Sequence, residues 1–194
     1  AILRQELAWV PAADAFLPVT HLPALLKENR TLTLTIDEKT SEVALLWHSR
    51  FTVGNQTNTV VLTGSSYHGL GVRFLRELDP VAAHLTPAGP PDLANNRQDV
   101  TAHPWEAVRF DAPGRPATLA LFGAPGNPRG NPHFFAMRTP FAYLSATQRL
   151  DQEPLIYRAG DTFELRYLIT LYSEIKTPEA LAARARRFAA SPQP

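Results

Sequence analysis

An eleven-residue run near the end of the chain, Thr162–Tyr172, constrains the fold most strongly. Large apolar side chains occupy every second position of this run: Phe163, Leu165, Tyr167, Ile169 and Leu171. Because successive side chains of a β-strand point to opposite faces, the alternation predicts a strand with one apolar and one polar face. Residues 31–36 repeat the pattern, with threonines alternating with leucine and isoleucine. An apolar face must be buried against a second layer, so both runs predict a layered β protein.

Shorter apolar runs separated by turn residues extend this pattern along the chain. The 18 prolines and 10 glycines of the sequence supply many of the turns. We expect further strands over residues 1–10, 43–53, 59–62, 70–74, 105–110 and 117–122. Many short strands with Pro- and Gly-rich turns indicate two packed antiparallel sheets. The sequence therefore predicts an all-β fold, an antiparallel two-sheet β-sandwich that forms a single domain over residues 1–194.

One helix is predicted, over residues 177–189 at the C-terminal end. Thr177 provides an N-cap, Pro178 the first helical position and Glu179 an acidic group in the first turn. A narrow apolar stripe follows at helical spacing, made of Leu181, Ala185 and Phe188. We expect the stripe to pack on the edge of the sandwich; the alternative is a helix that binds a partner.

Residues 80–102 break the strand pattern. They contain four prolines and an Asn-Asn pair, and they show no hydrophobic period. The stretch is too long for a hairpin loop, so we expect an irregular insertion, either crossing a site or mobile.

Composition and charge exclude several functional classes. A net charge of +1 with scattered arginines provides no basic stripe for nucleic acid. The absence of cysteine excludes disulfides, thiol nucleophiles and cysteine-based zinc sites. No apolar run approaches the roughly 18–20 residues that a membrane-spanning helix needs. The compartment stays open, either cytoplasmic or periplasmic and secreted.

The six histidines show no spacing typical of a local metal site, such as His-x-His or HExxH. The sequence therefore predicts no locally encoded metal site and no cofactor. A metal site assembled from several strands stays open.

Residues 123–135 form the most distinctive connection in the chain. They hold three prolines, three glycines and two asparagines between two apolar runs. Because Asn-Pro and Pro-Gly pairs set tight turns, we expect a rigid loop that presents Asn127, Arg129, Asn131 and His133. Polar groups on a stiff loop between strands indicate a recognition site.

A second candidate site surrounds Tyr67 and His68, which follow a Gly-Ser-Ser turn and precede a strand that carries Arg73. An aromatic face suits the carbon face of a sugar, and a guanidinium suits a hydroxyl or carboxylate group. The alternative is a glycine-enabled bend in which the Tyr67 hydroxyl satisfies a backbone carbonyl.

Glu106 lies in the predicted strand 105–110, directly after Trp105. Its carboxyl group could act as a general acid or base if it pointed into a cleft. An exposed strand carboxylate is the alternative.

Several short motifs follow one another in a characteristic order. They are Tyr67-x-Gly-Leu-x-x-Arg73, Trp105, Pro125-x-Asn-Pro-Arg129, Phe134-Phe135, an Ala159-Gly-Asp161 turn before Leu165-Arg-Tyr167, and an early Glu28-x-Arg-Thr31. Over roughly residues 20–172 they resemble the bacterial family labelled methane oxygenase PmoA-like, a soluble domain of unknown function distinct from the membrane monooxygenase. The resemblance implies a mutarotase-like or jelly-roll-like β-sandwich of the kind found beside sugar-metabolising genes.

The chain departs from that family in two places. The family usually has Asp-His-Pro at the head of the loop, where this chain has Gly123-Ala-Pro125. The family's His-rich N-terminal portion has no counterpart before Ala1, and Ala1 is not an initiator methionine. We therefore expect a processed or truncated product that lacks an upstream portion. Either difference could make the chain catalytically silent, or half of a site that another polypeptide completes.

The sequence thus supports two functions. In the first, the protein recognises a sugar or sugar acid and acts on it by acid–base chemistry, with His68, His133 and Glu106 as candidate catalytic groups. The binding residues would be Tyr67, Arg73, Asn127, Arg129 and Trp105. In the second, it is a non-catalytic structural or binding subunit, with a partner chain completing the sandwich or as a homo-oligomer.

Overall fold

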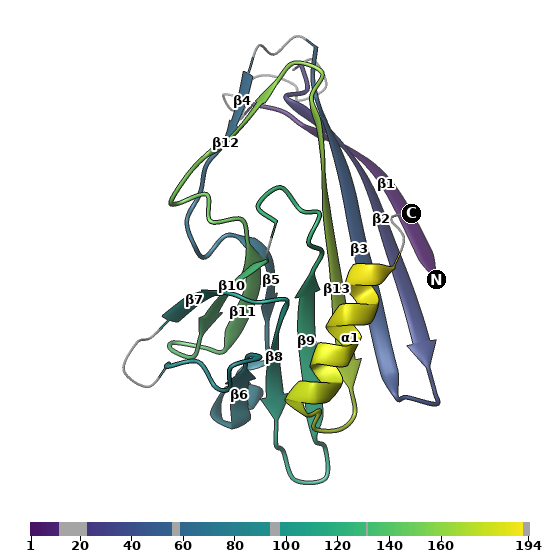
Figure 1. Cartoon of the computed structure of the whole chain (residues 1–194), viewed down its shortest axis with the longest axis vertical. Helices are drawn as coiled ribbons and strands as arrows, with labels where there is room; N and C mark the ends of the chain where they lie inside the picture. The colour runs from purple at the N-terminus through teal and green to yellow at the C-terminus, as the bar shows by residue number, and fades with distance from the viewer. Residues whose placement is uncertain (12–22, 56–58, 94–97, 131, 192–194) are drawn as a thin grey trace.

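The computed structural model describes residues 1–11, 23–55, 59–93, 98–130 and 132–191. Figure 1 shows a β protein with a C-terminal helix on one side. The strands are β1 (Ile2–Trp9), β2 (Leu26–Asp37), β3 (Glu42–Val53), β4 (Thr59–Leu62), β5 (Gly69–Arg73), β6 (Ala82–Leu85), β7 (Gln98–Ala102), β8 (Trp105–Phe110), β9 (Ala117–Gly123), β10 (His133–Met137), β11 (Tyr143–Thr147), β12 (Leu155–Arg158) and β13 (Thr162–Tyr172). The helices are the 3-10 helix η2 (Arg76–Val81) and the α-helix α1 (Pro178–Ala190).

The strands form two main antiparallel sheets and a two-stranded ribbon. The seven-stranded sheet has the order β1-β2-β3-β13-β9-β8-β6, the four-stranded sheet has the order β5-β11-β10-β7, and β12 pairs with β4. The predicted all-β antiparallel fold with one C-terminal helix is confirmed.

The two main sheets pack face to face through alternate residues of their strands. Phe134 and Leu144 come from the four-stranded sheet, and Val108, Leu121 and Tyr167 come from the seven-stranded sheet. All five side chains are buried. The period-2 pattern of the sequence therefore places one face of each strand in this interior.

Helix α1 covers the other face of the seven-stranded sheet. Its stripe of Leu181, Ala185 and Phe188 is buried, as predicted. Thr177 caps the helix, because its hydroxyl accepts a hydrogen bond from the Ala180 backbone N–H at 3.3 Å. No helix in the described part of the chain is long and apolar enough to cross a membrane.

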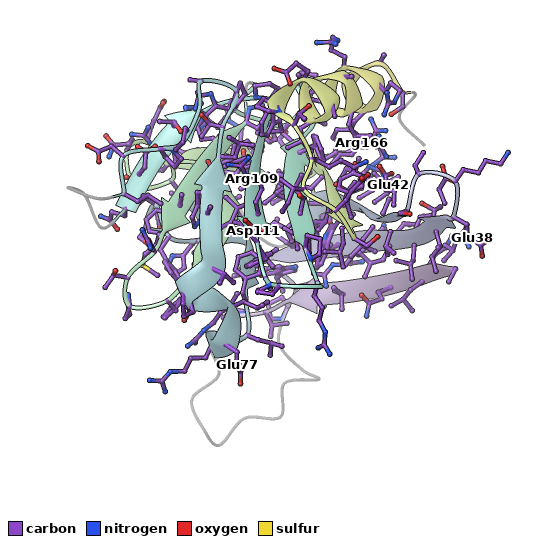
Figure 2. All side chains as sticks on the ribbon, turned by 90° about the horizontal axis from the view of Figure 1, so that it is seen from below. Glu38, Glu42, Glu77, Arg109, Asp111 and Arg166 are labelled. Carbon is purple, nitrogen blue, oxygen red and sulfur yellow. The ribbon has the colours of Figure 1, made fainter. Side chains whose placement is uncertain are left out.

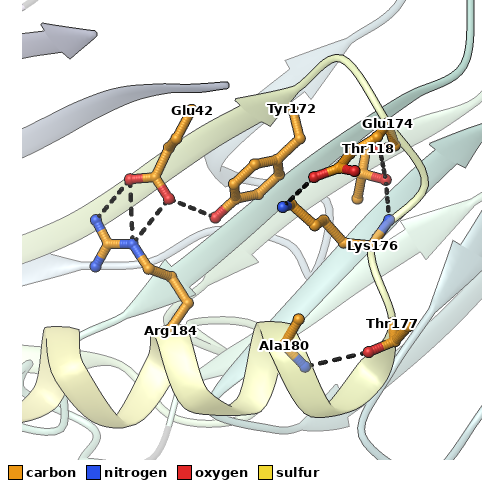
Figure 3. Close-up of polar contacts among 8 residues, drawn as sticks. All are labelled: Glu42, Thr118, Tyr172, Glu174, Lys176, Thr177, Ala180 and Arg184. Atoms are coloured by element: carbon orange, nitrogen blue, oxygen red, sulfur yellow. Dashed lines mark hydrogen bonds and ion pairs between the residues drawn. The ribbon is translucent and has the colours of Figure 1, made fainter. Parts of the chain in front are cut away.

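Polar contacts fix α1 against the sheet (Figure 3). Arg184 donates to the carboxylate of Glu42 through Nη2 at 3.0 Å, and the Tyr172 hydroxyl donates to the same carboxylate at 2.6 Å. Burial and the hydrogen bond to Glu42 raise the pKa of Tyr172 to about 12. Arg166, beneath the helix in Figure 2, donates to the Ser191 hydroxyl at 2.6 Å. These contacts hold the helix within the molecule.

The four-stranded sheet faces only part of the seven-stranded sheet. Figure 1 shows it on the opposite side of the molecule from β1 and β2. Leu32 of β2 pairs with Trp47 of β3, so the even-numbered apolar residues of β2 share the inner face of the sheet. Nevertheless Ile36 is 69 % exposed, and Leu3 opposite Leu32 is 52 % exposed. An inner-facing apolar surface on β1 and β2 is therefore open to solvent.

The prediction of an irregular insertion over residues 80–102 is wrong at both ends. β6 occupies Ala82–Leu85 at the edge of the seven-stranded sheet, and β7 occupies Gln98–Ala102 at the edge of the four-stranded sheet. Both strands are short, and their inner faces carry polar groups such as His84 and Asp99, so neither shows apolar alternation. Residues 94–97 lie outside the described chain.

Candidate functional site

A pocket of about 410 Å³ lies against the inner faces of β1, β2, β3 and β13. This volume is within the range of small-molecule sites in proteins, roughly 300–1,000 Å³. Strands contribute Trp9, Arg30 and Trp47, and the loops around the four-stranded sheet contribute His68 and Gln148. Leucine and phenylalanine side chains form much of the remaining wall. The pocket therefore combines an apolar lining with a few placed polar groups.

A buried carboxylate organises the strand side of the pocket. Glu28 is 1 % exposed and accepts hydrogen bonds from three side chains. The donors are Trp9 Nε1 at 2.9 Å, Arg30 Nε at 2.7 Å with Nη2 at 3.0 Å, and the Ser49 hydroxyl at 2.6 Å. Trp47 Nε1 in turn donates to the Ser49 hydroxyl at 3.0 Å. One network thus orients both pocket tryptophans and the arginine.

The network keeps Glu28 ionised. Burial alone would raise the pKa of Glu28, but the hydrogen bonds from Arg30, Ser49 and Trp9 outweigh it, and the pKa is lowered. A carboxylate that accepts four hydrogen bonds has little capacity left for a substrate proton. We therefore assign Glu28 a role in orienting its neighbours rather than in proton transfer.

Arg30 connects the network to an aromatic face. Its guanidinium lies 4.9 Å from the ring centroid of Trp47 while Glu28 holds its Nε and Nη2. The ion pair leaves this part of the pocket with no net charge. Trp9 lines the pocket and is 51 % exposed, so part of this side chain is open to solvent.

A glutamine supplies a polar group on the other side of the pocket. Gln148 Nε2 donates to the Tyr167 hydroxyl at 2.9 Å. Burial raises the pKa of Tyr167 to about 12, so this hydroxyl is neutral at physiological pH. Gln148 Oε1 is buried and has no hydrogen-bond partner among the described residues.

His68 is the only predicted catalytic residue that lines this pocket. Its Nδ1 accepts a hydrogen bond from the Ser65 backbone N–H at 3.2 Å, which ties the ring to the preceding turn. The chain then passes close to β11 at Gly69, where a Cβ atom would lie 2.0 Å from the Ala146 carbonyl oxygen. Glycine is required for this approach, and the approach brings His68 to the pocket.

The predicted loop groups Asn127 and Arg129 have structural contacts. Asn127 is buried, and its amide donates to the Arg166 carbonyl at 3.2 Å and accepts from the Arg166 N–H at 2.8 Å. Arg129 Nη1 donates to Glu153 at 2.8 Å, and its Nη2 donates to the Glu153 carbonyl. Asn127 thus joins the loop to β13, and its amide is not available to a ligand.

Tyr67 and Arg73 lie on the outer face of the four-stranded sheet. Tyr67 stacks on Tyr143 with ring centroids 4.5 Å apart, and Arg73 lies over the ring of Phe141 at 3.9 Å. Tyr143 in turn covers Gly71, where a Cβ atom would lie 2.0 Å from its hydroxyl oxygen. These side chains form a small aromatic cluster separate from the pocket lining.

Trp105 and His133 also lie outside the pocket lining. Trp105 is fully buried beneath α1, where it packs with Leu181 and Phe188. It is closed to solvent, so the structure does not bring it together with the other predicted binding residues. His133 begins β10 on the same face as Phe135, because Phe134 points into the interior between the sheets.

Glu106 is buried between the sheets rather than placed in a cleft. Its carboxylate is 3.6 Å from His84 Nδ1, which is too long for a hydrogen bond. Burial raises the pKa of Glu106; His84 opposes the rise, and Asp99 adds to it. Neither His68 nor His133 is among the groups that act on this pKa. The structure does not bring the three predicted catalytic residues into one site.

This burial predicts a pH effect on stability. The folded-state pKa of Glu106 lies above that of an unfolded glutamate, about 4.5, so the folded protein loses stability as the pH rises above that value. Glu106→Gln removes this ionisation. We expect the free energy of unfolding of the variant, relative to that of the wild type, to increase by about 1 kcal/mol as the pH is raised from 4.5 to 8. Urea unfolding at both pH values measures the difference. Glu77→Gln, on exposed η2 (Figure 2), is the control; equal pH profiles for the wild type and Glu106→Gln would contradict the assignment.

Sequence reasoning missed most of the pocket. From the sequence, Glu28 and Arg30 were recognised only as part of a family motif, and Trp9 and Trp47 only as residues of predicted strands. The available signal was a Glu-x-Arg pair on the apolar face of a predicted strand, where a charge has to find a partner.

The fold and the pocket together define an all-β sandwich with a small-molecule-sized cavity on the inner face of its larger sheet. The chain belongs to a family of unknown function (DUF6807), whose model matches residues 1–186. The match gives family membership and does not itself support the narrower PmoA-like label. No curated protein matches the chain.

Proposed function

We propose that the protein recognises a neutral sugar or a related polyol in the pocket of Trp9, Arg30, Trp47, His68 and Gln148. The observation that carries this proposal is the pairing of two indole rings with a fixed polar network inside one pocket. Aromatic faces suit the C–H faces of a sugar ring, and amide, guanidinium and imidazole groups suit its hydroxyls. The motif resemblance to the PmoA-like family adds support for a sugar ligand.

The charge of the pocket favours a neutral ligand over a uronic acid. Glu28 already neutralises Arg30, so this ion pair offers no unpaired positive charge to a ligand carboxylate. We therefore expect a hexose to bind more tightly than its uronate.

The proposal gives binding more weight than catalysis. Glu28 is ionised and fully hydrogen-bonded, and Glu106 is buried elsewhere. His68 remains as the one acid–base candidate beside the bound molecule. Acid–base chemistry on a sugar would then depend on His68, and its replacement would lower turnover more than affinity.

Isothermal titration calorimetry with glucose, galactose, rhamnose, glucuronate and galacturonate tests the proposal. Trp47→Ala removes an aromatic face of the pocket, and we expect it to weaken binding about tenfold or more. Circular dichroism checks that the variant is folded. Tyr67→Ala is the matched control, because it removes an aromatic side chain from the outer cluster.

Two results would oppose this assignment. Loss of binding in Tyr67→Ala with retention in Trp47→Ala would place the sugar at the outer aromatic cluster. No heat of binding with any of the five sugars would overturn the sugar proposal itself.

The open apolar surface of β1 and β2 favours a second function, that of a subunit in an assembly. Leu3, Leu34 and Ile36 share the inner face, and each is exposed. Contiguous exposed apolar surface usually marks an interaction site. This function is compatible with a ligand in the pocket.

A further inference from the structure

β1 is an edge strand without the usual protection against pairing. It is the first strand in the order of the seven-stranded sheet, and no described residue pairs with its outer side. It is eight residues long and contains no proline. Natural proteins usually shorten, kink or cover such edges, because the free backbone groups bind other strands.

The hydrogen bonds of β1 identify which backbone groups are free. Ala1 and Leu34 exchange both hydrogen bonds, each at 2.8 Å. In an antiparallel pair this pattern alternates, so the odd-numbered residues of β1 bond to β2. The even-numbered residues therefore present their N–H and C=O groups at the outer edge; they are Ile2, Arg4, Glu6 and Ala8.

The side chains of this edge are self-complementary. If two β1 strands pair antiparallel about a two-fold axis at Gln5, Arg4 lies opposite Glu6 of the second copy, and the reverse pair forms as well. On the inner face the same register places Leu3 opposite Leu7 of the second copy. Arg4 and Glu6 are exposed, and neither forms an ion pair within the described chain. Opposite charges across strands stabilise pairing, and like charges oppose it.

Neighbouring registers are disfavoured by charge. Backbone pairing allows shifts of two residues at a time, since only the even-numbered residues are free. A shift in one direction places Arg4 opposite Arg4, and a shift in the other places Glu6 opposite Glu6. The register centred on Gln5 avoids both contacts and pairs all four free residues of β1, so it is the favoured pairing.

We propose that β1 pairs with β1 of a second copy of this chain and joins the two seven-stranded sheets into one. Each facing pair of even-numbered residues contributes two backbone hydrogen bonds, and the Leu3–Leu7 contacts reduce the exposed apolar surface. This is an isologous contact, in which both copies use the same strand. The inference rests on the subunit function above and is independent of the ligand in the pocket.

Sedimentation velocity of the full chain at about 1–100 µM tests the pairing. We expect a dimer that dissociates on dilution. Glu6→Arg and Arg4→Glu should each raise the dissociation constant about tenfold or more, because each places like charges opposite one another twice. The double variant Arg4→Glu/Glu6→Arg restores both opposite-charge pairs, so it should restore the dimer. Glu38→Arg, in the exposed turn between β2 and β3 (Figure 2), should have no effect.

Crosslinking gives a second measurement. The chain has no cysteine, so Gln5→Cys introduces a single thiol. In the proposed register the two thiols face each other at a non-hydrogen-bonded pair, within reach of a disulfide. Mild oxidation should give a covalent dimer of Gln5→Cys, whereas Glu38→Cys should form no covalent dimer.

A monomer at every concentration would overturn the pairing, as would a dimer indifferent to the single charge reversals or a double variant that stays monomeric. Sugar titrations of the Glu6→Arg variant separate the two proposals. Retained binding by a monomeric variant would leave the pocket assignment in place.

Discussion

Trp105→Ala is expected to lower the free energy of unfolding by about 3–5 kcal/mol, the usual cost of removing a large aromatic side chain from a core. Trp105 is 0 % exposed and packs between β9 and helix α1, against Phe122, Leu181 and Phe188. Its removal would leave a cavity that the surrounding strands cannot close without losing backbone pairing. Urea unfolding followed by far-UV circular dichroism measures the change.

Trp105→Phe is the control for this prediction. The indole Nε1 has no hydrogen-bond partner among the described residues, so phenylalanine gives up volume but no hydrogen bond. We expect it to cost clearly less than the alanine variant, about 1–2 kcal/mol. A change below about 1 kcal/mol in Trp105→Ala, together with a loss of sugar binding, would return Trp105 to the ligand site.

The strands that could be predicted are those in which apolar and polar residues alternate along the local sequence. In β13, Phe163, Leu165 and Tyr167 face the core side as predicted, and α1 begins after the predicted cap, Thr177. β6 and β7 could not be predicted, because short edge strands pair on one side only and need no apolar period. Their existence depends on partners elsewhere in the chain.

The pocket depends on register, which local sequence does not encode. Arg30 meets Ser49 because β2 and β3 pair over their full length, and Tyr167 meets Trp47 because β13 pairs with β3 across more than a hundred residues of chain. The composition of residues 123–135 predicts a polar, rigid loop, of which Asn131 lies outside the described residues. Its polarity serves the backbone, however, since Asn127 bonds to Arg166. Sequence reasoning identified polar groups without their partners.

The apolar alternation of β2 correctly predicts an inner face but not what covers it. Leu32, Leu34 and Ile36 point to the core side, yet the four-stranded sheet packs over the other end of the larger sheet. The alternation of apolar and polar residues in a strand indicates which of its faces tends to be buried. It does not indicate whether the same chain or another one covers that face. This is why the surface that would take part in an assembly is identified only from the structure.

Glu28→Gln is the second substitution for which we expect a large effect, a loss of about 2–4 kcal/mol in the free energy of unfolding near pH 7. The amide keeps the shape of the side chain but replaces one acceptor oxygen by a donor. At least one of the donors from Trp9, Arg30 and Ser49 would then face another donor in a buried position. Because the network orients both tryptophans, sugar affinity should fall as well.

The pH dependence distinguishes this effect from simple loss of packing. The pKa of Glu28 is lowered in the folded state, so its stabilisation is present above the unfolded value, about 4.5, and is lost as the pH falls through the folded-state pKa. The difference between the wild type and Glu28→Gln should therefore be largest near pH 7 and shrink on acidification. Glu164→Gln is the control, because its partly exposed carboxylate pairs with His48 at 3.0 Å near the surface and should cost no more than about 1 kcal/mol. A difference that stays constant from pH 7 to pH 3 would mean that the charge of Glu28 does not hold the network together.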